Sequence, residues 1–250
     1  VDHIGIEEGL RKRYGKDKTF AIPILANAAL AGMVPWKKVT ALPFELACFP
    51  NAVYRFLRLP VVSYAIPALV AIGQARFFQR PPRNPMTWLM RKLTVNKSLR
   101  VLQRIQPASG GYLEAIPLTS FVAMNLAASG RANHPVTTQG VKFLMSTVRD
   151  DGSWPIDSDL ATWNTSLAIK ALDQNETDVA TLNATTWLLS CQHTESHPYT
   201  GAAPGGWGWS NLSGAVPDCD DTPAALLALD AIRRSDSFSV TDFPQMTTAA

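Results

Sequence analysis

Three carboxylates lie close together in one short segment of the sequence. Asp218, Asp220 and Asp221 fall within four residues, just before the apolar stretch Ala224–Leu229, and a Gly-Gly-Trp-Gly-Trp run precedes them at 205–209. Crowded carboxyl groups away from water cannot all ionise cheaply, so we expect at least one to keep its proton. A neutral carboxyl in apolar surroundings is suited to act as a general acid. Helix capping and metal binding are the alternatives for this cluster.

The elements that position the cluster are predicted from a repeat in the second half of the chain. Its pattern is apolar, Leu, three residues, Gln, three residues, Gly, one residue, aromatic. The third copy reaches its aromatic residue late, after an insertion. We expect the aromatic residues to pack under helix ends and to join neighbouring hairpins. The copies have Leu102, Leu144 and Leu188 at the leucine position, Gln106, Val148 and Gln192 at the glutamine position, and Tyr112, Trp154 and Trp207 at the aromatic position.

A second block follows each copy, as Thr119–Leu126, Thr165–Leu172 and Thr222–Leu229. Thr and Leu seven residues apart lie on one helical face. We expect each Thr to be an N-cap, with Pro223 at the first helical position. Paired helices every 40 to 50 residues indicate an array of helical hairpins. Small apolar inner helices favour closure of that array, so the predicted fold is all-α, an α/α barrel or toroid.

Charge divides the 250-residue chain, whose formal net charge is +3. Residues 1–100 hold 16 Lys or Arg and 5 Asp or Glu, and residues 101–250 hold 7 and 15. A basic half favours contact with anions such as lipid headgroups. Without a phosphate loop, zinc-finger spacing or RNA-binding motif, nucleic acid is disfavoured as a partner. Three cysteines do not form a disulfide scaffold and favour a reduced, intracellular setting.

Two apolar stretches, Phe20–Trp36 and Leu59–Gly73, are too short to cross a bilayer, and each contains two prolines. One interpretation is a pair of buried core helices. The other is monotopic insertion into one leaflet, with basic side chains at the headgroups. The basic residues in question are Arg55, Arg58, Arg76, Arg80 and Arg83.

Together these motifs resemble the squalene–hopene cyclase family. The aromatic repeats resemble its QW motifs, and Asp218–Thr222 resembles its DxDD(T) motif. Val34–Lys37 and Ala41–Asn51 are similar to its PW and ALPPE…LPN segments, and Ala161–Thr165 is similar to its WDT segment, with Asn164 in place of Asp. The resemblance implies a class II triterpene cyclase with two α/α barrel domains. It also implies squalene taken from the bilayer, a homodimer, no metal and no cofactor, and a monotopic position on the cytoplasmic face of the membrane.

The resemblance also assigns roles. Asp220 protonates a terminal C=C bond, and Asp218 and Asp221 tune and position it. Cyclisation then proceeds through carbocations that aromatic faces stabilise in a dry site. Substrate contacts are assigned to Trp163, Trp209 and Thr222.

The domain organisation implied is partial. Residues 1–158 are expected to be part of a first barrel, with the basic and apolar membrane-facing region. Residues 159–250 are expected to open a second barrel that carries the acidic motif. The family is longer than this chain, and its acid has a His partner beyond the motif, whereas no His follows His197. We therefore expect the 250-residue piece to be inactive by itself.

Two alternatives stay open. One is a zinc-dependent, prenyltransferase-like barrel, for which Cys191, His193, Glu195 and His197 offer ligands. The other is a barrel that binds isoprenoid lipids without catalysis.

Overall fold

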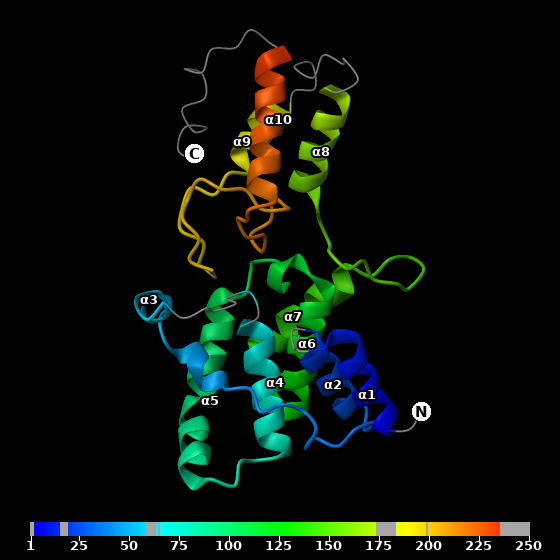
Figure 1. Cartoon of the computed structure of the whole chain (residues 1–250), viewed down its shortest axis with the longest axis vertical. Coiled ribbons are helices and arrows are strands. Elements are labelled where there is room, and N and C mark those ends of the chain that lie inside the picture. Colours follow the sequence, from blue (N-terminus) through cyan, green and yellow to red (C-terminus); the bar gives the residue numbers. More distant parts are fainter. Residues whose placement is uncertain are drawn as a thin grey trace. The chain divides into compact units, whose positions relative to one another are not determined.

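The computed structural model describes residues 3–15, 20–58, 64, 66–173, 184–198 and 200–235. Every regular element in these residues is a helix, as Figure 1 shows, which confirms the all-α prediction. The elements are α1 (His3–Tyr14), α2 (Ala21–Leu30), η1 (Phe44–Cys48), α3 (Asn51–Phe56), α4 (Ile66–Gln79), α5 (Pro85–Ile105), η3 (Tyr112–Glu114), α6 (Ile116–Leu126), η4 (Ala127–Arg131), α7 (Pro135–Ser146), α8 (Ala161–Asp173), α9 (Thr185–Ser190) and α10 (Asp221–Ser235).

The chain divides into two compact units, residues 1–156 and residues 157–250. In the first, α4 packs against α6, α6 packs against α7, and η1 lies against α5. Helix α4 buries small and branched side chains such as Ala71 and Ile72. In the second unit, α10 packs against α8 and also contacts α9. Trp207 lies at 0% exposure in the core of that unit. The assignment of each unit to a barrel domain stays a prediction.

Local capping explains where two long helices begin. The side chain of Asn84 accepts hydrogen bonds from the main-chain N–H groups of Met86 (2.9 Å) and Thr87 (3.3 Å) at the start of α5. The ring nitrogen Nδ1 of His134 accepts from the N–H of Val136 (3.3 Å) at the start of α7. A proline follows each cap, at the helix position where its missing N–H costs nothing.

The three copies of the sequence repeat make the same hydrogen bond. In each, the aromatic side chain of the turn donates to the main-chain oxygen of the repeat's leucine, in the last turn of the helix before it. The bonds join Tyr112 Oη to Leu102 O (2.9 Å), Trp154 Nε1 to Leu144 O (2.7 Å) and Trp207 Nε1 to Leu188 O (2.7 Å). The aromatic residues therefore fasten each turn to a helix end.

The glutamine position of the repeat braces the glycine of the turn. Gln106 Nε2 donates to the main-chain oxygens of Gly110 (2.9 Å) and Val136 (3.1 Å). Gln192 Nε2 donates in the same way to the oxygen of Gly205 (2.8 Å). The spacing of the repeat therefore reflects two kinds of hydrogen bond, one from the aromatic residue to the leucine oxygen and one from the glutamine to the glycine oxygen.

The predicted threonine caps are wrong. Thr119 is the fourth residue of α6, Thr165 the fifth of α8, and Thr222 the second of α10, so Pro223 is the third residue of α10. Inside α6, the hydroxyl of Thr119 donates back to the oxygen of Ala115 (2.8 Å), as helical threonines commonly do. Acidic residues upstream hold the starts of α8 and α10 instead.

The two apolar stretches differ in the structure. Of Phe20–Trp36, only Ala21–Leu30 is helical. Residues 59–63 and 65 lie outside the described residues, and Ile66–Gly73 forms the start of the buried helix α4. In the part of the chain that the structure describes, no helix combines the length and apolarity needed to span a membrane.

Candidate active site

The acidic motif forms the N-terminus of α10. Oδ1 of Asp218 accepts hydrogen bonds from the main-chain N–H groups of Asp220 (2.9 Å) and Asp221 (2.7 Å). Its own main-chain oxygen accepts from the N–H of Thr222 (3.3 Å). The first N–H groups of a helix have no partner within it, so a carboxylate here satisfies them. Asp218 therefore serves as the cap of the helix that carries the other two carboxyls.

Asp221 is the buried member of the three, with 5% of its surface exposed. Burial raises its pKa most, and a hydrogen bond with Asp218 and the negative charges of Asp218 and Asp220 raise it further, to about 7. Asp221 therefore holds a proton close to neutral pH.

Asp220, to which the family resemblance assigns proton donation, lies on the exposed side of the helix start. Its main-chain oxygen accepts a hydrogen bond from the N–H of Ala224 (3.3 Å), so it is held by the backbone of α10. Its charge acts on Asp221. The structure thus separates the three carboxyls into a cap, an exposed carboxyl and a buried one whose pKa is raised.

The glycine-rich run at 205–209 lies directly against the acidic segment. A Cβ on Gly206 would meet Pro217 Cβ and Thr222 Oγ1 at 2.9 Å, and one on Gly208 would meet the main-chain oxygen of Val216 at 2.8 Å. The hydroxyl of Thr222 accepts from Trp207 N (3.0 Å) and donates to Trp207 O (3.1 Å). In this structure Thr222, predicted to contact substrate, joins the two segments.

The predicted aromatic residues come from the two segments beside the motif. The N–H of Trp163, on α8, donates to the main-chain oxygen of Trp209 (3.1 Å). Both side chains are half-buried. Trp209 Nε1 is buried and has no hydrogen-bond partner within the described part of the chain. The structure therefore brings Trp163 and Trp209 together through their backbones.

Asp159 is a site residue that the sequence did not single out. Its Oδ1 accepts hydrogen bonds from the N–H of Ala161 (2.9 Å), at the start of α8, and from the hydroxyl of Ser210 (2.8 Å). It thereby ties α8 to the segment that follows the glycine-rich run. Its position two residues before a helix is the signal that could have identified it.

The zinc alternative finds no ligand set in the described residues, where no three His, Cys, Asp or Glu side chains approach as metal ligands. The rings of His193 and His197 are 5.5 Å apart between centroids. Burial raises the pKa of the Cys191 thiol, and its Sγ donates to the main-chain oxygen of Trp187 (3.2 Å). A thiol in this state is a poor zinc ligand, because zinc binds the thiolate.

Comparison with known proteins gives two relatives. The chain is 32% identical to a sporulenol synthase of Bacillus subtilis over 121 residues, covering 44% of this chain and 19% of the relative. It is 24% identical to a squalene–hopene cyclase of Bradyrhizobium diazoefficiens over 263 aligned positions, covering 82% of this chain and 40% of the relative. No family model matches the sequence. Both relatives are squalene–hopene cyclase family members, which confirms the resemblance, and the chain spans less than half the length of either.

Proposed function

We propose that this chain, as a relative of the squalene–hopene cyclases, is the acid-bearing part of a class II terpene cyclase. Its substrate is squalene or another linear polyprene, and its product is a polycyclic triterpene. The observation that carries the proposal is the burial of the Asp221 carboxyl at the start of α10, beside Asp218 and Asp220, which raises its pKa to about 7. An alkene is a very weak base, so protonation needs a carboxyl kept neutral near pH 7 and shielded from water.

Within this proposal, the proton held on Asp221 passes to Asp220, which delivers it to the terminal C=C bond. Asp218 fixes the geometry through its two N–H contacts. Asp221 keeps one carboxyl of the group neutral, so that the three do not all carry charge at once. The alkene gains this proton, and Asp220 and Asp221 are both left as carboxylates. The cation then moves along the substrate as each new C–C bond forms, and loss of a proton from the last cation gives the neutral triterpene.

The aromatic residues beside the motif stabilise the cationic intermediates. Trp163 and Trp209 present π faces, which attract a cation without attacking it, by about 0.5–2 kcal/mol each. Thr222 holds the Trp207 peptide and so fixes the wall beside Asp221. Neither a cofactor nor a metal takes part in the proposed protonation.

The test is conversion of squalene, measured by mass spectrometry of the extracted products. The complete gene product is assayed beside the 250-residue chain, each as wild type, Asp220→Asn and Asp221→Asn. Glu195→Gln is the matched control, because it removes an exposed carboxylate from the same unit. We expect the complete protein to form a cyclised triterpene, both Asp variants to lose at least about 100-fold in rate, and the control to keep its rate. Full activity of Asp220→Asn would refute its role as donor.

We also propose that the first unit lies on a membrane surface, in monotopic fashion and on the cytoplasmic face. The N-terminal half of α5 has an exposed apolar stripe in which Met86, Leu89 and Leu93 share one face. Phe56, at the end of α3, is 86% exposed, and the basic residue Arg58 follows it. Exposed apolar side chains beside cations are typical of proteins that insert into one leaflet.

The proposed architecture is that of two partial α/α barrels, residues 1–158 and 159–250, in a protein that forms a homodimer. The repeated fastening of aromatic turns to helix ends supports it, because such arrays are built from identical hairpin joints.

A second candidate function is binding of isoprenoid lipid without turnover. It is favoured by an apolar pocket of about 390 Å³ between α6 and α7, whose lining includes Trp154. Retention of squalene by a folded complete protein that forms no product would select this function over catalysis.

A further inference from the structure

Four arginines line one pocket in the first unit, whereas the acidic motif belongs to the second. The pocket has a volume of about 410 Å³ and lies among the end of α4, the loop after it, the second turn of α5 and the segment before η1. Its remaining walls are Ala41, Pro81 and Pro82. The lining arginines are Arg76, Arg80, Arg83 and Arg91.

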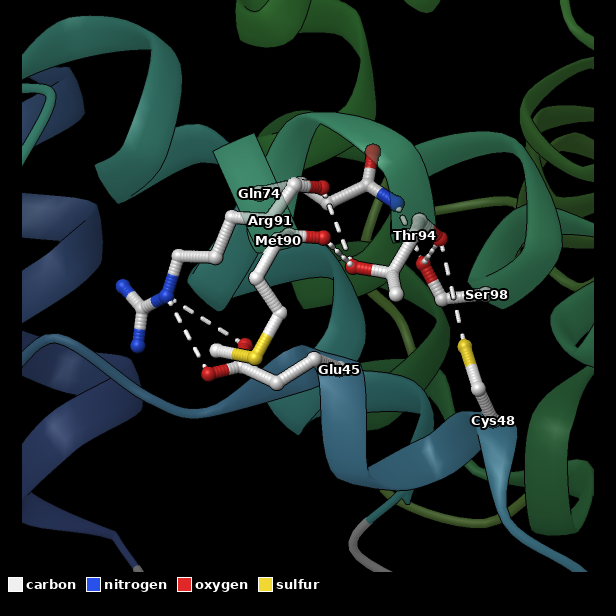
Figure 2. Close-up of polar contacts among 7 residues, drawn as sticks. All are labelled: Glu45, Cys48, Gln74, Met90, Arg91, Thr94 and Ser98. Atoms are coloured by element: carbon white, nitrogen blue, oxygen red, sulfur yellow. Dashed lines mark hydrogen bonds and ion pairs between the residues drawn. The ribbon is translucent and has the colours of Figure 1, made fainter. Parts of the chain in front are cut away.

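Arg91 is buried, with 7% of its surface exposed, and it uses only part of its guanidinium. Its Nε lies 3.3 Å from both carboxylate oxygens of Glu45. Figure 2 shows that its two terminal nitrogens point away from Glu45. No hydrogen bond joins those nitrogens to any described residue. A buried charged group with unused donors at a pocket wall is suited to hold an anion.

The scaffold around Arg91 is fixed by buried hydrogen bonds between α4 and α5. Nε2 of Gln74 donates to the oxygen of Val95 (3.1 Å). It also donates to Oγ of Ser98 (2.9 Å), as Figure 2 shows. These contacts lie one and two turns beyond Arg91 on α5. The guanidinium is therefore held in place before any ligand arrives, which lowers the entropic cost of binding.

The positive charges around the pocket repel one another. Burial lowers the pKa of Arg76, and the charges of Arg80 and Arg91 lower it further. Glu45 is the one acidic residue among the pocket's described contacts, and no other Asp or Glu occurs in the sequence between Glu45 and Glu114. An anion with two or more charges would relieve this repulsion.

We propose that this pocket binds the phosphate group of an organic phosphate. The guanidinium fork matches phosphate oxygens in pairs, and several forks around one site favour a dianion over a monovalent ion. The volume exceeds that of a bare phosphate, and the proline walls offer apolar contact to the group that the phosphate carries. Two sources have this chemistry, a phospholipid headgroup and a soluble organic phosphate. The inference concerns the first unit alone and does not depend on the proposed cyclase activity.

The test compares two double variants that remove the same charge. The pocket variant, Arg80→Gln with Arg83→Gln, removes the two exposed positive charges that line the pocket. The control variant, Arg100→Gln with Arg104→Gln, removes two exposed positive charges farther along α5. Pyrophosphate is titrated into each 250-residue chain by calorimetry at fixed salt. Flotation is measured with phosphatidylcholine vesicles, with and without phosphatidic acid. We expect the pocket variant to lose at least about tenfold in affinity and the control less than about twofold.

The two probes also identify the source. Loss of pyrophosphate binding with unchanged flotation assigns the pocket to a soluble phosphate. If flotation of the pocket variant no longer increases with phosphatidic acid, the pocket is assigned to a phospholipid headgroup, whether or not pyrophosphate binding is also lost. Binding of neither probe to the wild type, or an equal loss in both double variants, would overturn the proposal, because the effect would then be net charge alone.

Discussion

Replacing Asp221 with Asn should stabilise the protein, and more so as the pH rises. In the folded state the pKa of Asp221 is raised from 3.8 to about 7, so the folded form keeps a proton that the unfolded form releases. Folding therefore carries a penalty that is absent below about pH 4, grows between pH 4 and 7, and is constant above. Asn has the shape of the neutral carboxyl and can donate to Asp218 in the same way.

The size of the effect follows from the pKa. The full shift corresponds to about 4 kcal/mol at about 1.36 kcal/mol per pH unit. Because Asp220 and the first turn of α10 contact solvent, part of the penalty is screened, and we expect about 1–2 kcal/mol at pH 8. The gain in unfolding free energy of Asp221→Asn over wild type should be near zero at pH 4.

The assay is urea unfolding at several pH values from 4 to 8, followed by circular dichroism and tryptophan fluorescence. Glu195→Gln, which removes an exposed carboxylate in the same unit, should show no such trend. A gap between Asp221→Asn and wild type that stays constant with pH, or a variant less stable at pH 8, would refute the idea that burial raises the pKa of Asp221.

Three further predictions concern packing. Tyr112→Phe should lose about 1–2 kcal/mol of unfolding free energy, because it leaves the buried main-chain oxygen of Leu102 without its donor. Trp154→Phe should lose less, since Trp154 is 46% exposed. Thermal melts of the two variants compare these losses. Gly111→Ala should cost about 1–3 kcal/mol, because its Cβ would lie 2.4 Å from the ring of Phe143, and a melting temperature equal to wild type would contradict this. Gly9→Ala should raise stability by about 0.5–1 kcal/mol, since it is exposed within α1 with nothing near its Cβ, and hydrogen exchange in α1 would report the gain.

The sequence predicted the contacts between aromatic turns and helix ends well because their signals are local. The leucine, glutamine and aromatic positions of the repeat correspond to hydrogen bonds in the structure, such as those that Gln106 and Tyr112 donate to main-chain oxygens. The helix starts were predicted less well. Thr119 had the composition of a cap but lies inside α6, because the backbone had already turned helical at Ile116.

Which of the three carboxyls is buried, and so has the raised pKa, could not be derived from the sequence. Three acids in four residues predicted that one would stay neutral, but which one depends on how α10 lies against the rest of its unit. The rotation of the helix buries Asp221 and exposes Asp220. Likewise, Asp159 meets Ser210 only because distant segments are brought together by the fold.

The hydrogen bond from each aromatic side chain to the leucine oxygen limits where the chain can vary in length. The donor and acceptor are ten residues apart in two copies and nineteen in the third, yet the bond forms in all three. The nine additional residues are accommodated outside the joint, without changing which groups meet. The turn between Gln192 and Gly205 therefore tolerates length polymorphism, and a short epitope grafted there should leave the hairpin's register intact.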